Sequence, residues 1–340
     1  MTDFIDTNPS IPTYWRSIVL LGRNVASYKF ALAKTLIEIP KDDSNILLED
    51  LALPFAKNIS EHLKICEKQI TSSSSKFLDS CKKFNLNEIS ENDLKESAIR
   101  FGFLNVIDAF HNVAGNEVPR FFTDDRRKNN QIKLTDNFYK LFEDENHGNL
   151  YSEVDARWRL WETAISLNIS PNLVEINYDS NNEFLTIKNH DLRRIGVTSA
   201  KNALNGYQKG QCFYCSRKIL IETGFSNSCD VDHFFPHILK RMGARNIDQI
   251  WNLVLSCKNC NRGEDGKFEK VPDVKFLKLL DKRNNYYVES PHPLRETILN
   301  QTGFSRSERR NFLQKIYNFA SNQIPSTTKW KPKEFFENNL

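Results

Sequence analysis

Two Cys-x-x-Cys pairs constrain this 340-residue chain more than any other feature of its sequence. They are Cys212-x-x-Cys215 and Cys257-x-x-Cys260. Each pair presents two thiolates from one tight turn, and four thiolates at about 2.3 Å complete a closed tetrahedral zinc site. Such a site is structural because it leaves no coordination position open, and zinc binding can supply roughly 10 to 16 kcal/mol toward folding. The sequence therefore predicts a structural Zn²⁺ held by all four cysteines.

The remaining cysteines and the start of the chain indicate where the protein resides. Seven cysteines are too few and too unevenly placed for a disulfide framework. The three outside the pairs, Cys66, Cys81 and Cys229, are interpreted as buried small apolar residues. The first thirty residues hold no continuous apolar run of signal-peptide or membrane-span length. We therefore expect a cytoplasmic protein with no membrane partner.

The charge of the chain is divided unevenly along its length. Residues 1–190 carry 22 Lys+Arg and 28 Asp+Glu, a net charge of −6, whereas residues 191–340 carry 25 and 15, a net charge of +10. Such asymmetry is typical of a polyanion-binding segment joined to a segment with another task. A solvated, lysine-rich surface is the alternative explanation. The basic half also contains both cysteine pairs, which favours the first interpretation.

The apolar pattern divides the chain into four parts. Helical spacing over residues 1–170 predicts a helical domain, in which the Ser-rich stretch at 71–75 fits either a loop or a continued helix. Pro171 breaks this pattern, and two alternating runs within residues 171–190 predict a β-hairpin with a linker. Residues 191–270 start with a short helical pattern at 191–207 and hold the cysteine pairs. Residues 271–340 predict a basic helical segment whose last helix spans about 307–323.

The segment between the cysteine pairs carries candidate catalytic residues. Asp230-Val231-Asp232-His233 reads as a strand, Asn252 precedes a short buried apolar run, and Asn261-Arg262-Gly263 follows the second pair. Hydrolysis of a phosphodiester needs a base to activate water and a cation to stabilise negative charge on phosphate. A histidine next to an aspartate, together with an amide side chain from a second element of secondary structure, can supply both the base and the ligands for the cation.

Residues 212–267 resemble an HNH endonuclease domain, because the elements just described follow one another in the order found in that family. The run Asp230-Val231-Asp232-His233, followed by Asn261-Arg262-Gly263, is also similar to the HNH domain of the RNA-guided CRISPR nuclease, which has Asn at the same last position. The resemblance implies a small ββα-metal domain. The expected fold class is therefore mainly α with a small α+β nuclease domain.

The resemblance also implies roles for individual residues. His233 matches the general base that deprotonates the attacking water. Asp232 and Asn261 match the two protein ligands of one catalytic Mg²⁺ or Mn²⁺, a hard ion that prefers oxygen atoms. Asn252 matches the middle Asn of the family name, whose side chain pins the loop between the two strands. Asp230 is expected beside these groups without contacting the cation.

Double-stranded DNA is the partner that the resemblance implies. Phosphate contacts position a protein on DNA without specifying sequence, and basic side chains near the motif or on the last helix are the candidates. These candidates are Arg241, Arg245, Arg262, Lys267, Arg309 and Arg310. The cluster on the last helix fits a solvated face equally well. We interpret His237 as solvated or phosphate-facing, and His292 as a turn residue.

The expected function is a metal-dependent DNA endonuclease in bacterial restriction or antiphage defence, a setting that rests on the resemblance alone. One alternative is an inactive, zinc-stabilised DNA-binding module, opposed by the intact Asp232, His233, Asn252 and Asn261. Others are an HNH homing endonuclease or a ribonuclease. Residues 1–170 carry no recognised motif and are a candidate surface for a second copy of the chain or for another protein.

Overall fold

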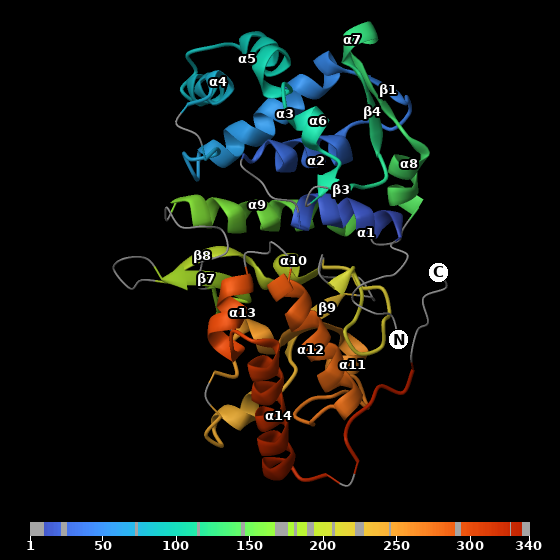
Figure 1. The fold of residues 1–340 in the computed structure, drawn as a ribbon, viewed down its shortest axis with the longest axis vertical. Helices are drawn as coiled ribbons and strands as arrows, with labels where there is room; N and C mark the ends of the chain where they lie inside the picture. Colours follow the sequence, from blue (N-terminus) through green and yellow to red (C-terminus); the bar gives the residue numbers. More distant parts are fainter. Residues whose placement is uncertain are drawn as a thin grey trace. The chain divides into compact units, whose positions relative to one another are not determined.

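The computed structural model of the chain is mainly helical with small antiparallel sheets (Figure 1). It describes residues 10–21, 26–71, 74–113, 116–143, 147–166, 176–179, 182–188, 194–205, 208–221, 228–244, 246–289, 294–326 and 328–334. Two compact units divide the chain, an N-terminal unit from Pro9 to Ile169 and a C-terminal unit from Ser170 to Leu340. No helix in the described ranges is long and apolar enough to span a membrane.

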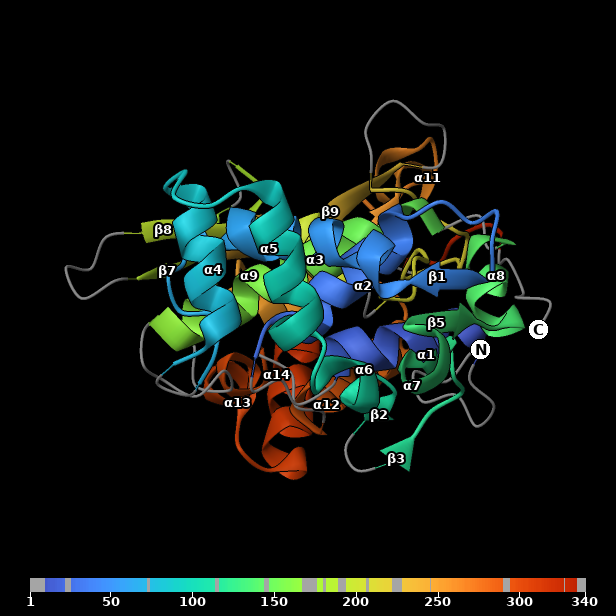
Figure 2. The ribbon, with the colours of Figure 1, turned by 90° about the horizontal axis from the view of Figure 1, so that it is seen from above.

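Helices make up most of the N-terminal unit, as the periodicity predicts. They are α1 Ile11–Arg16, α2 Tyr28–Glu38, α3 Leu48–Leu63, α4 Lys76–Asn85, α5 Glu91–Ser97, α6 Val106–Ala109, α7 Arg126–Asn129, α8 Asp136–Glu143 and α9 Leu150–Ser166. Helix α2 packs against α3 and α9, while α4 and α5 pack on α3 (Figure 2). Buried aromatic side chains fill the space between these helices, among them Trp15, Phe30, Phe55 and Trp158.

Two helices of this unit start at a serine whose side chain caps the first turn. Ser75 accepts a hydrogen bond from the Leu78 amide and caps α4, and Ser90 forms a reciprocal capping box with Asp93 at the start of α5. Because α3 ends at Leu63 and α4 begins at Lys76, the described residues between them are not helical. The loop alternative for residues 71–75 is therefore confirmed for those that the structure describes.

Short strands interrupt the helices and were not predicted. Strand β5 (Gln131–Leu134) lies between β1 (Asn45–Leu47) and β4 (Phe122–Asp125) in an antiparallel sheet. Strands β2 (Asn112–Val113) and β3 (Asn116–Glu117) form a separate pair. With two to four residues each, such strands are too short to show a period-two pattern in the sequence.

A three-stranded antiparallel sheet opens the described part of the C-terminal unit. It contains β6 (Asn177–Asp179), β7 (Phe184–Lys188) and β8 (Arg194–Ser199), with β7 in the middle. The expected hairpin corresponds to β6 and β7, although the beginning of its first run, at residues 173–175, lies outside the described residues. The helical pattern expected over residues 191–207 is wrong for β8 and holds for α10 (Ala200–Asn205).

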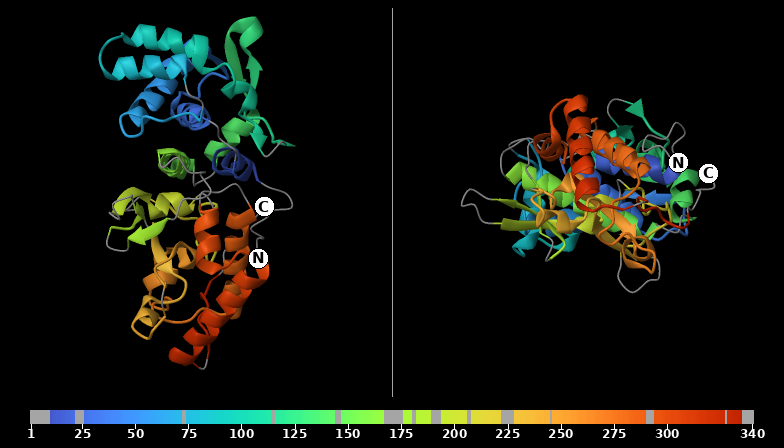
Figure 3. Two further views of the ribbon diagram at one scale, coloured as in Figure 1. Left: turned by 60° about the vertical axis from the view of Figure 1, so that its left-hand side comes forward. Right: turned by 90° about the horizontal axis from the view of Figure 1, so that it is seen from below.

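The C-terminal half of this unit consists of a strand pair and helices. The elements are β9 Cys229–His233, β10 Leu253–Cys257, α11 Lys258–Arg262, α12 Val274–Glu289, α13 Arg295–Thr302 and α14 Arg306–Gln323. Helices α12, α13 and α14, orange to red in Figure 3, pack against one another. Ser305 and Glu308 form a capping box at the start of α14, which agrees closely with the helix predicted at 307–323.

Strands β9 and β10 are antiparallel, and their register brings the motif residues together. His233 pairs with Leu253 at one end, and Cys229 pairs with Cys257 at the other. Every residue of β10 is buried, and the helix α11 that follows it contacts both strands. Two strands and one short helix thus carry Asp232, His233, Cys257, Cys260, Asn261 and Arg262.

A buried arginine anchors the start of β10 to helix α12. The side chain of Arg283 is fully buried, and its guanidinium donates hydrogen bonds to the carbonyl oxygens of Leu253 and Trp251. It also donates to the side chain of Asn284, which itself bonds the Trp251 carbonyl. Buried carbonyl groups need such donors, because leaving them unpaired is costly.

We predict that Arg283→Met destabilises the C-terminal unit by about 3 kcal/mol, because it leaves several buried carbonyls without donors. Urea denaturation monitored by tryptophan fluorescence measures this loss. Arg310→Met, at an exposed position of α14, is the matched control and should change stability by less than about 0.5 kcal/mol. Equal stability of the two variants would contradict the anchoring role of Arg283.

Candidate active site

The four cysteines of the two pairs converge on one point. Cys212 and Cys215 lie in the turn before β9, Cys257 ends β10, and Cys260 lies in α11. Their sulfur atoms all lie within 4.8 Å of one another, and all four residues are buried. The Sγ atoms of Cys215 and Cys257 are 3.7 Å apart, close to the edge of about 3.8 Å expected for a tetrahedron with zinc–sulfur bonds of about 2.3 Å. The donor set therefore fits a structural zinc ion.

Hydrogen bonds attach the segment of the first cysteine pair to β10, the strand that ends at Cys257. The Phe213 amide donates to the Leu255 carbonyl at 3.0 Å. The Gln208 side chain bonds both polar backbone groups of Leu255, accepting from its amide at 2.8 Å and donating to its carbonyl at 2.9 Å. The position of the Cys212–Cys215 turn is thus fixed by protein contacts as well as by the thiolates.

Asp232 is buried, and both of its carboxylate oxygens have partners. The Tyr214 hydroxyl donates to Oδ2 at 2.7 Å, and the Lys267 ammonium lies 3.1 Å from Oδ1. Burial raises the pKa of Asp232, while the positive charge of Lys267 and the hydrogen bond from Tyr214 favour its charged form and oppose that rise. The contacts with Tyr214 and Lys267 therefore hold the Asp232 side chain in a defined orientation.

His233 lies at the end of β9 and is largely buried, with 15% of its side chain exposed. Burial lowers its pKa to about 4, although the nearby carboxylate of Asp248 acts in the opposite direction. The imidazole is thus neutral near pH 7. Asp248 Oδ1 lies 3.2 Å from the Nε2 atoms of both His233 and His237, and Asp248 Oδ2 accepts a hydrogen bond from Lys240 at 2.6 Å.

Asn252 is fully buried and bridges the connection between β9 and β10. Its Oδ1 atom accepts a hydrogen bond from the Phe235 amide at 2.8 Å. Its Nδ2 group donates to the carbonyls of Phe235 and Ile247 at 3.0 and 2.9 Å. One side chain therefore ties two points of this connection together, directly after His233.

Asn261 and Arg262 both contact Asp230 rather than Asp232. The Asn261 amide donates to Asp230 Oδ2 at 3.1 Å, and the Arg262 guanidinium binds the same carboxylate at 2.9 and 3.1 Å. Asp230 and Asp232 point to the same face of β9, because side chains alternate along a strand. Asp230 thus ties the helix α11 to the face of β9 on which Asp232 lies.

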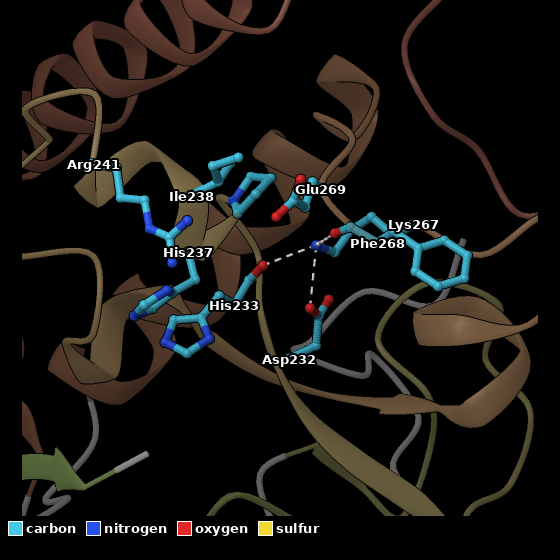
Figure 4. Close-up of a pocket in the computed structure, with 9 residues that line it drawn as sticks. Asp232, His233, His237, Ile238, Arg241, Lys267, Phe268 and Glu269 are labelled. Carbon is cyan, nitrogen blue, oxygen red and sulfur yellow. Dashed lines mark hydrogen bonds and ion pairs between the residues drawn. The ribbon is translucent and has the colours of Figure 1, made fainter. Parts of the chain in front are cut away.

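A pocket of about 210 Å³ opens beside these residues (Figure 4). Asp232 and His233 contribute to its wall together with His237, Arg241 and Lys267. In Figure 4 the Lys267 ammonium lies between the Asp232 carboxylate and the His233 backbone oxygen. The pocket therefore gives solvent and small groups access to the Asp-His pair of the motif.

The basic residues suggested as DNA contacts differ in their surroundings. Arg241 is exposed at the pocket wall, and Arg310 is exposed on α14. Arg309 is only 4% exposed and donates to Asn285 and to backbone carbonyls, so the prediction that it contacts DNA is wrong in this structure. Arg245 and His292 lie outside the described residues.

The prediction that Lys267 contacts phosphate also needs correction. The whole residue is buried, and its ammonium is paired with Asp232 and with backbone oxygens. An ammonium group has three protons to donate, and three acceptors surround this one. Lys267 is therefore an internal cation of the site.

Sequence reasoning missed several residues that organise the site. Tyr214 lies between Cys212 and Cys215, at a position that the Cys-x-x-Cys motif does not specify. Asp248 lies in the connection between β9 and β10, and Gln208 precedes the first cysteine pair. None of them belongs to a motif with a fixed spacing. A tyrosine between two zinc-binding cysteines is the one available signal, since a buried hydroxyl needs a polar partner.

Comparison with known proteins supports the same segment. The HNH endonuclease family model matches residues 212–272 of the 340. No curated protein and no solved structure matches the chain. The resemblance to HNH endonucleases is thus confirmed for the segment that holds both cysteine pairs, β9, β10 and α11, and it supports nuclease activity at the level of the family.

We predict that Cys257→Ser loses most of the bound zinc and lowers the melting temperature of the C-terminal unit by at least about 10 °C, because zinc contributes a large part of its folding free energy. Zinc content by mass spectrometry and calorimetry measure both effects. The matched control is Cys229→Ser, since Cys229 is buried and paired in register with Cys257 but lies outside the sulfur cluster. Zinc retention by Cys257→Ser, or equal zinc loss in both variants, would contradict the assignment.

Proposed function

We propose that the chain is a metal-dependent endonuclease that hydrolyses phosphodiester bonds of DNA with His233 as general base. The observation that carries this proposal is the common pocket of Asp232 and His233, within the segment that matches the HNH endonuclease family. The match of residues 212–272 to the HNH endonuclease family supports a nuclease, and the arrangement of these side chains supports their individual roles.

His233 has the properties of a general base. A neutral imidazole can accept a proton from water, and the low pKa given by burial keeps His233 neutral at physiological pH. The carboxylate of Asp248, 3.2 Å from Nε2, stabilises the positive charge that develops when the ring accepts a proton. Asn252 restrains the chain directly after His233 and so limits the positions that the imidazole can adopt.

Asp232 and Asn261 are the residues that would hold the catalytic cation. A carboxylate and an amide oxygen are ligands of the kind that Mg²⁺ prefers, and the pocket reaches Asp232. The donor set therefore fits a hard divalent ion in its chemistry, with Asp230 beside Asn261 as a further carboxylate. When bound, such an ion stabilises negative charge on the phosphate and on the leaving oxygen.

DNA is the proposed substrate, because the family acts on DNA and because residues 191–340 carry a net charge of +10. Arg241 and Arg310 are the exposed basic side chains that we propose as phosphate contacts. We further propose a role in bacterial restriction or antiphage defence, a setting suggested only by the type of nuclease.

One observation favours a second candidate function, a zinc-stabilised DNA-binding module without nuclease activity. Both oxygens of Asp232 already have protein partners, and the Asn261 amide is turned toward Asp230. A site that had lost its cation would keep such contacts. Nicking of supercoiled plasmid separates the two functions, and the same assay on structured RNA tests a ribonuclease.

We predict that His233→Ala lowers the plasmid nicking rate by roughly 10² to 10⁴-fold, because it removes the proton acceptor. DNA affinity and melting temperature, measured on the same preparation, should stay nearly unchanged. His237→Ala is the matched control, because both imidazoles lie at the same distance from Asp248 and only His237 is half exposed. It should lower the rate by less than about tenfold. Undiminished nicking by His233→Ala, or loss of nicking only together with unfolding, would remove the catalytic role.

We predict that Arg241→Ala weakens DNA binding for all sequences alike and reduces the slope of log Kd against log salt concentration by about 1, because one phosphate contact is lost. Fluorescence anisotropy over a salt series measures this slope. Lys278→Ala, at an exposed position of α12 outside the pocket wall, serves as control. An unchanged slope for Arg241→Ala would exclude Arg241 from the DNA interface.

A further inference from the structure

Lys267 is a fully buried cation in a pocket where the family of enzymes is expected to bind a metal ion. Its Nζ atom lies 3.1 Å from Asp232 Oδ1, 3.0 Å from the carbonyl oxygen of His233 and 3.2 Å from its neighbour's carbonyl, that of Phe268. All three protons of the ammonium can therefore be directed at acceptors. Three oxygen atoms thus surround the Lys267 ammonium, as they would surround a small cation.

The backbone at Lys267 and Phe268 is held by the helix α11, which carries Cys260. The Lys267 amide donates to the Cys260 carbonyl at 2.7 Å, and the Phe268 amide donates to the Asn261 carbonyl at 3.0 Å. A side chain on Gly266 would lie 2.9 Å from the backbone of Asn261 and Arg262, so only glycine fits the turn before Lys267. The backbone around Lys267 is thus held against α11.

This arrangement has an electrostatic consequence for metal binding. Asp232 brings one negative charge into a buried site, and Lys267 already neutralises it. A divalent cation that approaches the same carboxylate meets a like charge at short range, and like charges repel more strongly in a largely buried site than in bulk water. The hydroxyl of Tyr214, on the other carboxylate oxygen, is neutral and adds no such repulsion.

We propose that Lys267 is a resident counter-cation of Asp232 with which a divalent metal ion must compete, so that this lysine sets the metal affinity of the site. The inference rests on the proposed function, since it takes Asp232 as a metal ligand. Lys267 acts through Asp232 and is a positioning residue. It holds the carboxylate in one orientation when no divalent ion is bound, and it weakens the binding of that ion.

The test is the affinity of the full-length, zinc-loaded protein for Mn²⁺, measured by isothermal titration calorimetry. Lys267→Gln removes the charge and keeps an amide that can donate to the carbonyls. Its Kd for Mn²⁺ should be at least about tenfold lower than that of the wild type, because repulsion from a close charge is removed. The melting temperature of the variant should also rise more on addition of Mn²⁺ than that of the wild type, since ligand binding to the folded state stabilises it.

Two further variants make the result specific. Asp232→Asn combined with Lys267→Gln removes the carboxylate as well, so the gain in Mn²⁺ affinity should disappear. Lys240→Gln removes an exposed positive charge that is paired with Asp248, outside this ion pair, and should change the Kd by less than about threefold, because solvent screens exposed charges. Zinc content, measured on each protein, verifies that the cysteine site stays loaded.

An equal or higher Kd for Lys267→Gln, or no detectable Mn²⁺ binding by either protein, would overturn the proposal. If Lys267→Gln does not fold without metal, recovery of its native circular dichroism by Mn²⁺ supports the proposal, and failure to recover overturns it. Nicking by the wild type is a separate readout. Tighter Mn²⁺ binding without nicking would contradict only the nuclease function, and nicking with unchanged affinity would contradict only the role of Lys267.

Discussion

The antiparallel pairing of β9 with β10 is the contact on which the rest of the candidate site depends. Its register places Cys257, one of the four clustered cysteines, at one end and His233 at the other end, at the pocket. Separate side chains hold this pair in place. Gln208 binds the middle of β10, Arg283 binds its start, and Asn252 closes the connection between the strands. The strand pair therefore connects the four clustered cysteines at one end to His233 at the other end.

The charges of the pocket are arranged in two neighbouring sets. In the buried set, the negative charge of Asp232 is balanced by the positive charge of Lys267. In the more exposed set, Asp248 faces His233, His237 and Lys240. A neutral imidazole thus lies beside an anion that can stabilise its protonated form.

The sequence was sufficient for features with a fixed spacing and insufficient for features that depend on tertiary contacts. Thiolate spacing predicted the group of four cysteines, and helical periodicity predicted α12 and α14. The strands β1, β4 and β5 escaped prediction because they are too short for an alternating pattern. The burial of Lys267 and Arg309 could not be foreseen, since charged residues are usually exposed and only the fold supplies their partners. The role of Asp248 depends on a loop that brings it back to His233, which no local pattern encodes.

The most direct measurement of the central claim is conversion of supercoiled plasmid to open circles by the purified, zinc-loaded wild-type protein, with and without added Mg²⁺. The proposed nuclease should nick the plasmid only when Mg²⁺ is present, because the cation stabilises the charge that develops on phosphate. Intact plasmid after prolonged incubation with Mg²⁺ or Mn²⁺, by protein that binds DNA and retains its zinc, would contradict the account and favour a DNA-binding module.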